Sequence, residues 1–463
     1  MGKMVKRIIP FIIVALFVVF FLAEGNPPGQ SYKTLYEFHQ ATNLENSLFK
    51  NIVNAWYPRC LDTLYGGYTP NFEYDWNISP GPQNKFLVQQ ARHLWTLSFL
   101  YENYPDSGRF LDYAAHGFRF IRDHLRDTLF GGFYYECNRD GSPRQQSISF
   151  KRIYGEAFAI KGLALYYKVS GDPQALALAK STFRWMDDNA RDRQYGGYFQ
   201  VLKRDGTPVE HGKDKDGGDG DGPLTGLKEF NSSLHLLEAF TELYSVWPDE
   251  TLRSRFNEMY LLFRDTFIDP KGYLRLYFYP DWTLVPAPVM DSLSEGNYWY
   301  TQHITYGHDV ETAYLLEEAG EALGIKSDDK AKLLGKKLVD HALAHGWDNE
   351  KGGFYYVGYE YGDSTRIHVP YKAWWVEAEG LNALLMMSRL YPDDPAHYYD
   401  KFVQLWLYTD KYLIDHQYGG WYNWGLDNNP GNRTDKKSHN WKATYHNVRA
   451  MENCVMMQRG GKR

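Results

Sequence analysis

Three histidines stand inside apolar helical patterns, in positions suited to proton transfer. They are His308, His446 and His235, which follows Asn231 by four residues. Imidazole gives and takes protons near neutral pH. Two histidines that face each other across a pocket can strip a proton from one face of a carbon and return one to the other. This is the requirement for inverting a carbon next to a carbonyl group.

Other polar side chains recur near the starts of the same predicted helices. Asn231 and His235 are spaced i,i+4 and His308 and Glu311 are spaced i,i+3, so each pair shares one helix face. We expect Arg92 and His235 to stabilise charge on an enediolate oxygen, and Glu311 to orient His308 or steady its charged form. Glu379 follows the pair Trp374 and Trp375 near the start of another predicted helix. The candidates for substrate contact are Tyr154, Glu156, Asn231, Trp441 and the pair Trp374 and Trp375, between which the sequence does not choose.

An internal repeat predicts the elements that position these residues. An Asp, three residues and a Gly-Gly-aromatic turn, or a close variant, recurs six times at spacings of 65 to 79 residues. The repeats begin at Asp62, Asp127, Asp192, Asp269 (degenerate), Asp348 and Asp415. Each predicts a turn followed by a short aromatic strand, because the Gly pair adopts backbone angles that other residues resist.

Helical patterns with apolar residues at three- and four-residue spacing lie between the turns. They cover residues 94–101, 154–167, 231–244, 308–323, 374–390 and 445–456, and a second helix usually precedes each turn. Two helices in each of six repeats predict an all-α fold, an (α/α)6 barrel with short β-hairpins in the loops at one end. An open solenoid would need more regular repeats and polar caps. Since equivalent helix ends in a ring face one mouth, the polar side chains should converge on one pocket.

The N-terminal residues have the pattern of an export segment. Lys3, Lys6 and Arg7 precede an apolar run over residues 8–23, which is short for a membrane span. We therefore expect residues 1–25 to be a signal peptide or an N-terminal membrane anchor, and residues 26–463 to form one catalytic domain. The predicted location is extracytoplasmic or periplasmic, with membrane contact only through an uncleaved segment.

Charge and metal-ligand patterns restrict the possible partners. The net charge is −6 and no basic run appears, so nothing indicates nucleic acid. Cys60, Cys137 and Cys454 are too few and too scattered for a disulfide framework or a zinc site, although one bridge is conceivable. We expect no metal and no cofactor, since compact His-Glu-x-x-His spacing is missing. The acidic stretch 213–222 lacks a calcium loop's final Glu and is interpreted as a flexible surface loop.

Six stretches, in order along nearly the whole chain after residue 25, resemble the N-acylglucosamine 2-epimerase family, and within it most closely the cellobiose 2-epimerases. They begin at Arg92, Tyr154, Asn231, Tyr306, Lys372 and Trp441. The resemblance implies metal-free, reversible epimerisation at C2 of the reducing-end glucose or mannose of a disaccharide. It implies that His308 and His446 are the acid/base pair, that His235 and Arg92 open the ring and stabilise the enediolate, and that Asn231 and Glu311 support them. Trp374 or Trp375, and Trp441, would be sugar platforms.

Other functions remain open on the sequence alone. Within the family, an N-acylglucosamine epimerase or an aldose–ketose isomerase would use similar residues. A glycoside hydrolase on the same fold would need two carboxylates, such as Glu156 and Glu311, but would leave the histidines idle. A glycan-binding protein would need the aromatic residues but not Arg92 or three convergent histidines.

Overall fold

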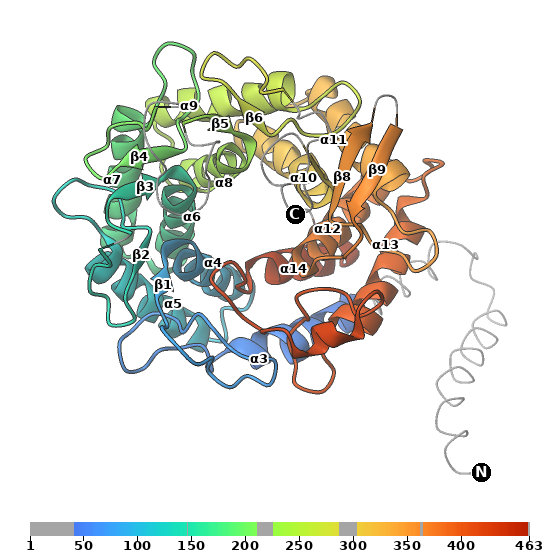
Figure 1. Ribbon diagram of the computed structural model, residues 1–463, viewed down its shortest axis with the longest axis horizontal. Coiled ribbons are helices and arrows are strands. Elements are labelled where there is room, and N and C mark those ends of the chain that lie inside the picture. Colours follow the sequence, from blue (N-terminus) through green and yellow to red (C-terminus); the bar gives the residue numbers. More distant parts are fainter. Residues whose placement is uncertain (1–40, 146, 211–225, 287–302, 362–363, 462–463) are drawn as a thin grey trace.

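In the part of the chain that the computed structural model describes, twelve helical segments form two concentric rings (Figure 1). The structure describes residues 41–461 except 146, 211–225, 287–302 and 362–363. The segments 1–25 and 213–222, for which we predicted an export signal and a surface loop, lie outside the described residues. Within the described part of the chain, none of the helices has the length and apolar character that a membrane span needs.

The inner ring consists of six helices, each of which contacts the next, and the last contacts the first. They are α4 (Leu87–Asn103), α6 (Ile153–Ser170), α8 (Phe230–Val246), α10 (Tyr306–Ala322), α12 (Trp374–Leu390) and α14 (Tyr445–Gln458). The contact between α14 and α4 closes the ring, so the prediction of a closed barrel rather than an open solenoid is confirmed. These helices are buried on most sides, as expected for an inner layer.

The outer ring surrounds the inner helices (Figure 1). It consists of η1 and α3 (Leu48–Val53, Asn54–Trp56), α5 and η2 (Arg109–Phe120, Ile121–Leu125), α7 (Pro173–Asn189), α9 and η4 (Glu250–Leu262, Phe263–Phe267), α11 (Asp329–His345), and α13 and η6 (Tyr398–Tyr408, Thr409–Leu413). Apolar side chains fill the space between the rings. The three cysteines are buried free thiols.

Short antiparallel strands connect neighbouring repeats at one end of the barrel. The pairs are β1 (Lys85–Phe86) with β2 (Glu136–Cys137), β3 (Phe150–Arg152) with β4 (Val201–Lys203), β5 (Lys228–Glu229) with β6 (Tyr277–Phe278), and β7 (Ile304–Thr305) with β8 (Val357–Tyr361), which also pairs with β9 (Ser364–Val369). A strand that leads into an inner helix thus pairs with the strand after the next Gly-Gly turn. These pairs fix the helix starts relative to one another.

The repeated Asp holds each turn together. Asp62 Oδ1 accepts hydrogen bonds from the backbone N–H groups of Leu64 and Tyr65. The equivalent Asp residues make the same two contacts, except that Asp269 in the degenerate copy accepts only from Lys271. A buried lysine just before the next inner helix pairs with the same carboxylate, as Lys85 does with Asp62 at 3.0 Å. The other pairs are Lys151–Asp127, Lys228–Asp192, Lys372–Asp348 and Lys437–Asp415, while Arg275 pairs with Asp269 in the degenerate copy. Each turn is therefore fastened beside the start of an inner helix.

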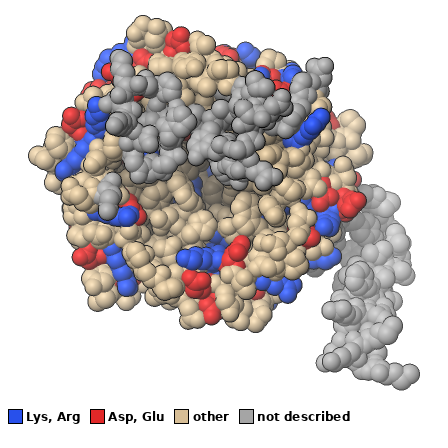
Figure 2. All heavy atoms as spheres, in the orientation of Figure 1, with Lys and Arg blue, Asp and Glu red and all other residues tan. Residues whose placement is uncertain are grey.

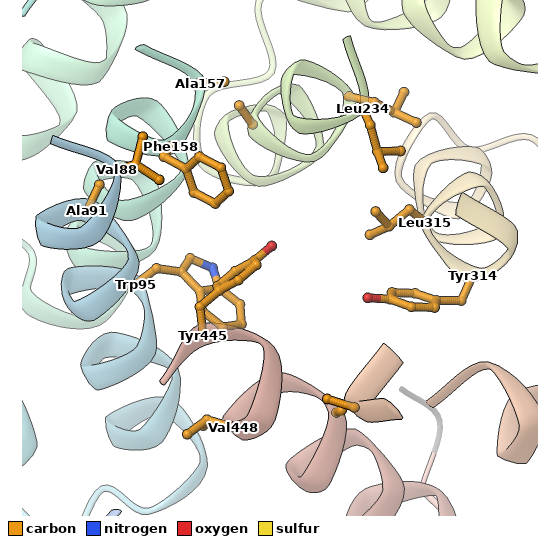
Figure 3. Packing of buried hydrophobic residues seen from close by; sticks show 14 of the residues in the cluster. Val88, Ala91, Trp95, Ala157, Phe158, Leu234, Tyr314, Leu315, Tyr445 and Val448 are labelled. Atoms are coloured by element: carbon orange, nitrogen blue, oxygen red, sulfur yellow. The ribbon is translucent and has the colours of Figure 1, made fainter. Parts of the chain in front are cut away.

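Aromatic side chains fill the middle of the ring. Figure 3 shows Trp95, Phe158, Tyr445 and Tyr314 projecting from α4, α6, α14 and α10 toward the centre. Trp95 and Tyr445 meet edge to face, with ring centroids 5.1 Å apart. These rings close the barrel partway along its axis, so each mouth leads to a separate hollow.

Candidate active site

A cavity of about 590 Å³ opens where the inner helices begin. Nine of the residues selected from the sequence line it: Arg92, Tyr154, Asn231, His235, His308, Trp374, Trp375, Trp441 and His446. They come from all six inner helices or the loops that lead into them. The predicted convergence on one pocket is confirmed. In Figure 2, which views the molecule along the barrel axis, basic and acidic residues are interspersed on the coloured part of the surface.

His446 is held by a buried carboxylate on the neighbouring helix. Its Nδ1 lies 2.5 Å from Oε1 of Glu379 on α12. The other Glu379 oxygen accepts a hydrogen bond from the Tyr314 hydroxyl at 2.5 Å. With Nδ1 engaged by the protein, Nε2 is the atom that His446 can offer to a substrate.

His235 has the same arrangement on α8. Its Nδ1 lies 2.6 Å from Oε2 of Glu238, one helical turn away. The other Glu238 oxygen accepts hydrogen bonds from Lys161 at 2.5 Å and from the Tyr445 hydroxyl at 2.6 Å, and it also binds Arg449. A buried carboxylate is satisfied only by such a set of donors.

Beneath the cavity, Arg449 links Glu238 and Glu379, the two carboxylates that hold the histidines. Its guanidinium group is buried and binds Glu238 through Nη1, and Glu311 and Glu379 through Nη2. The guanidinium fork, with fixed N–H directions, suits contacts with several carboxylates at once. The orientations of His235 and His446 therefore depend on one arginine.

His308 stands against the same tryptophan as His446. The Trp375 ring centroid lies 4.7 Å from that of His308 and 5.6 Å from that of His446. His308 Nδ1 is 2.9 Å from the Thr305 hydroxyl, so its Nε2 is also left for a substrate. Trp374 also lines the cavity, but it is nearly fully buried and contacts only His446 of the two histidines. Trp375 is thus the tryptophan placed between them.

Arg92 brings a positive charge to the cavity wall. It donates to the Trp441 carbonyl at 2.8 Å and to the Tyr154 hydroxyl at 2.9 Å. Its guanidinium also lies over the Phe158 ring, 4.4 Å from the centroid. These contacts hold the cation beside the histidines with no carboxylate paired to it in the described structure, so its charge is available to a developing oxyanion.

Burial lowers the pKa of all three histidines and so disfavours their charged forms. The pKa values of His308 and His446 lie well below the ordinary value, because burial penalises the imidazolium. Positive charge on the neighbouring histidines and on Arg92 disfavours the imidazolium further. Burial also lowers the pKa of His235, against the effect of Glu238. A neutral imidazole is the form that accepts a proton.

Glu311 does not have the predicted relation to His308. It lies below the cavity, where it binds Arg449, and its Oε1 is 3.9 Å from Nδ1 of His446. Although i,i+3 spacing puts the two side chains on one helix face, His308 reaches outward to Thr305 and Glu311 turns inward to the arginine. Burial, with the charge of Glu379, raises the pKa of Glu311.

Glu156 was predicted to contact substrate, and this is wrong in the structure. The side chain is buried away from the cavity, and its Oε1 accepts the backbone N–H of Phe133 at 2.8 Å. Gln90, Asp309 and Glu377 make the equivalent contact in other repeats. Glu156 is therefore one member of a repeated contact between an inner helix and a turn. The recurrence of an acid or amide at this position of the repeat could have indicated this structural role from the sequence.

Sequence reasoning missed the residues that support the histidines. It did not single out Glu238 or Arg449, and it gave Glu379 no role. Glu238 follows His235 and Arg449 follows His446 at the same i,i+3 spacing that had drawn attention to Glu311. The strand and loop residues of the cavity wall carried no such signal; they are Glu229, Tyr277, Tyr356, Ala373, Asn423, Trp424 and His439.

One group of side chains has the spacing of a metal site, but it is already occupied by a cation. Glu311, Glu379 and His446 offer ligand atoms within 4.8 Å of one another. Arg449 Nη2 binds both carboxylates, so the guanidinium stands where a metal ion would have to be. This geometry makes the group an arginine–carboxylate cluster.

The geometry of this cavity agrees with the comparison of the chain with known proteins. Residues 66–450 match the family model described as N-acylglucosamine 2-epimerase (GlcNAc 2-epimerase). The chain belongs to this family. Its resemblance to the family, predicted from six short stretches, is therefore confirmed, and the chain is an isomerase of the sugar-epimerase type.

Relatives match almost over their full lengths. Cellobiose 2-epimerase of Bacteroides fragilis is 29% identical over 88% of this chain and 96% of its own. The structure of cellobiose 2-epimerase from Spirochaeta thermophila superimposes with a TM-score of 0.76 at 28% identity, covering 93% of this chain and 99% of the other. D-mannose isomerase of Marinomonas mediterranea is 23% identical over 89% of this chain and 96% of its own.

Proposed function

We propose that the chain epimerises C2 of the reducing-end glucose or mannose of a β-linked disaccharide such as cellobiose. The observation that carries this proposal is the placement of His308 and His446 against Trp375, with Nδ1 of each engaged by the protein. The similarity to cellobiose 2-epimerases supports the substrate class.

The reaction begins with ring opening, which exposes the C1 aldehyde and makes the C2 proton acidic. His235 and Arg92 stand where they can assist ring opening and stabilise the oxyanion. One of the two histidines then accepts the C2 proton, and negative charge moves to the C1 oxygen. After rotation of the enediolate about C2–C3, the other histidine, which enters this step as the imidazolium, donates its Nε2 proton to the opposite face of C2. Each turnover leaves the first histidine protonated and the second neutral, and proton exchange with solvent restores their starting states.

The inner helices all begin at this mouth, and this favours the enediolate. Helix N-termini carry partial positive charge, which stabilises an anion nearby. Together with Arg92 they stabilise the negative charge that proton abstraction creates on the substrate. Trp375 and Trp441 offer apolar faces to the sugar rings.

Deuterium incorporation tests this function directly. The purified chain is incubated with cellobiose in deuterated water with EDTA, and the sugar is followed by NMR beside a His446→Ala control. We expect glucosyl-mannose with deuterium at C2 from the wild type and none from the variant. Unchanged cellobiose, or release of free glucose, would contradict the proposal.

A second candidate is aldose–ketose isomerisation, which the similarity to D-mannose isomerase favours. The two reactions share the enediolate and differ in where the proton returns: C2 for epimerisation and C1 for a ketose. The same NMR experiment separates them, because a ketose product has an anomeric C2 carbon that bears no hydrogen, and the product carries deuterium at C1.

Export is a separate proposal that depends on the N-terminal segment alone. The basic and apolar pattern of residues 1–25 supports it. Fractionation of cells that produce the full chain, with a variant lacking residues 1–25 as control, tests it; recovery of both in the cytoplasm would oppose export.

A further inference from the structure

A second cavity, of about 550 Å³, lies at the opposite mouth of the barrel. Side chains from the C-terminal halves of five inner helices line it, among them Trp95, Glu242, Leu315 and Asn453. Figure 3 shows Trp95 and Leu315 facing the middle of the ring from opposite sides. This cavity is distinct from the one with the histidines, and no step of the proposed reaction uses it.

The second cavity has a negative electrostatic character. Five glutamates line it against three basic residues: Glu102, Glu238, Glu242, Glu318 and Glu321 against Lys161, Lys168 and Arg449. The helices that line it also end here, so the negative ends of their dipoles face this mouth. The two mouths of the barrel therefore attract opposite charges.

The three basic residues are already engaged. Lys161 and Arg449 both bind Glu238, and Lys168 pairs with Glu102 at 2.8 Å. Within the described residues no salt bridge reaches Glu242 or Glu321. The Glu242 carboxylate accepts one hydrogen bond, from the Trp95 indole at 3.1 Å. Burial raises the pKa of Glu242, and the charges of Lys161 and Lys168 still act on this carboxylate and oppose that rise, but both lysines form their salt bridges with other glutamates.

Asn453 provides an independent sign of a ligand. Its side chain is 1% exposed and lines the cavity, yet neither its amide nitrogen nor its amide oxygen has a hydrogen-bond partner among the described residues. A buried amide without a hydrogen-bond partner is unfavourable, because it has lost its hydrogen bonds to water. An amide oxygen at this place can accept a hydrogen bond from an N–H donor in the cavity.

The spacing of the carboxylates indicates the kind of cation. A divalent metal ion needs several oxygen ligands around one point. Among the described residues, the one set of three acidic or histidine ligands that comes together belongs to the Arg449 cluster under the first cavity. The acidic groups of the second cavity instead surround a volume with apolar side chains between them, namely Phe99, Leu165, Leu315 and Met456. This combination suits ammonium groups joined by methylene chains.

We propose that the second cavity is a binding site for an organic polyamine cation. Its ammonium groups pair with Glu242 and Glu321 and donate to the Asn453 amide oxygen, and its methylene groups lie on the apolar wall. Only one layer of side chains separates it from the catalytic cavity, because Glu238 lines this cavity and binds His235 of the other.

Calorimetric titration of the full chain with spermidine tests the site at constant ionic strength. We expect saturable binding at one site per chain. The double variant Glu242→Gln/Glu321→Gln should weaken it at least tenfold, and Asn453→Leu severalfold. The charge-matched control is Asp188→Asn/Asp400→Asn, which changes two exposed carboxylates far from the cavity in sequence and should bind as the wild type does.

Each other result would overturn the proposal. Absence of binding would do so, and equal weakening in the control would show non-specific attraction to a negative protein. Binding of Mg²⁺ or Ca²⁺, without spermidine, would make the site a metal site. Circular dichroism of each variant establishes that it is folded. Since the titration involves no turnover, its result is independent of the proposed epimerase activity.

Discussion

Nδ1 of His446 and Oε1 of Glu379 are 2.5 Å apart, although 67 residues separate them in the sequence. The contact joins α14, the last inner helix, to α12, the inner helix before it. A carboxylate on Nδ1 fixes the tautomer and orientation of an imidazole and stabilises its charged form. The proposed acid/base residue thus acquires its geometry from a neighbouring repeat.

Glu379→Gln should therefore lower kcat without a comparable change in KM. The amide keeps the volume of the side chain but loses the charge and can present the wrong group to Nδ1. We expect kcat to fall roughly 10²- to 10⁴-fold, the usual contribution of a positioned acid or base. Steady-state kinetics on cellobiose measure it.

A matched control for Glu379→Gln is Glu452→Gln. Glu452 is also a buried glutamate of the inner ring, but it accepts a hydrogen bond from Tyr104, away from both histidines. Nearly normal kcat is expected in this variant. Equal losses in the two would mean that any buried charge change disturbs the barrel.

The two-histidine mechanism predicts opposite exchange behaviour for two variants. His308→Asn and His446→Asn each remove one base and leave the other. We expect both to lose net epimerisation, while each still exchanges the C2 proton of one epimer with solvent deuterium. One variant should label glucosyl-glucose and the other glucosyl-mannose. NMR of each pure epimer measures this, and labelling of the same epimer by both variants would point to a single base.

Trp441 should act mainly on substrate binding. Its side chain is 50% exposed at the cavity rim, while its backbone carbonyl accepts the Arg92 hydrogen bond. Trp441→Ala removes the ring and keeps that carbonyl. A lost aromatic contact of about 0.5–1.5 kcal/mol corresponds to a rise in KM of roughly 2- to 10-fold. Kinetics with cellobiose and with mannose as comparison measure it; a large loss of kcat with little change in KM would contradict a platform role.

The repeat made the barrel and its converging pocket predictable. Six similar turns, each followed by an inner-helix pattern, require equivalent helix ends, so Arg92 and the histidines could be assigned to one mouth. Family resemblance strengthened the same assignment. Local spacing was a weaker guide to partners. His308 and Glu311 share a helix face, yet His308 contacts Thr305 at the N-cap of its own helix, whereas Glu311 contacts Arg449 on another inner helix.

Contacts between distant repeats explain what the sequence could not reveal. Arg449 binds carboxylates on three other helices, and no spacing within one helix encodes such a set. Glu156, in contrast, was assigned to the site from the sequence but has a structural role. As a buried acid near an inner-helix start it resembled a site residue, but its partner is the Phe133 backbone in the preceding turn.

Glu156 should control stability rather than catalysis, and the sign of its pH dependence follows from its pKa. Burial raises the pKa of Glu156 from its ordinary value to about 8. Between the unfolded pKa and about 8 the folded chain binds more protons than the unfolded one. The contribution of this group to stability is thus fully present below the unfolded value and is lost as the pH rises through about 8.

Glu156→Gln should remove this dependence, since an amide cannot ionise and its oxygen can still accept the Phe133 N–H. From pH 6 to pH 9 we expect the free energy of unfolding of the wild type to fall more steeply than that of the variant, by at most about 1.4 kcal/mol per pH unit. Chemical denaturation across this range measures the difference. Epimerisation should be unchanged at pH 7. A variant that loses stability faster than the wild type with rising pH, or that loses activity while remaining folded, would show that Glu156 has another role.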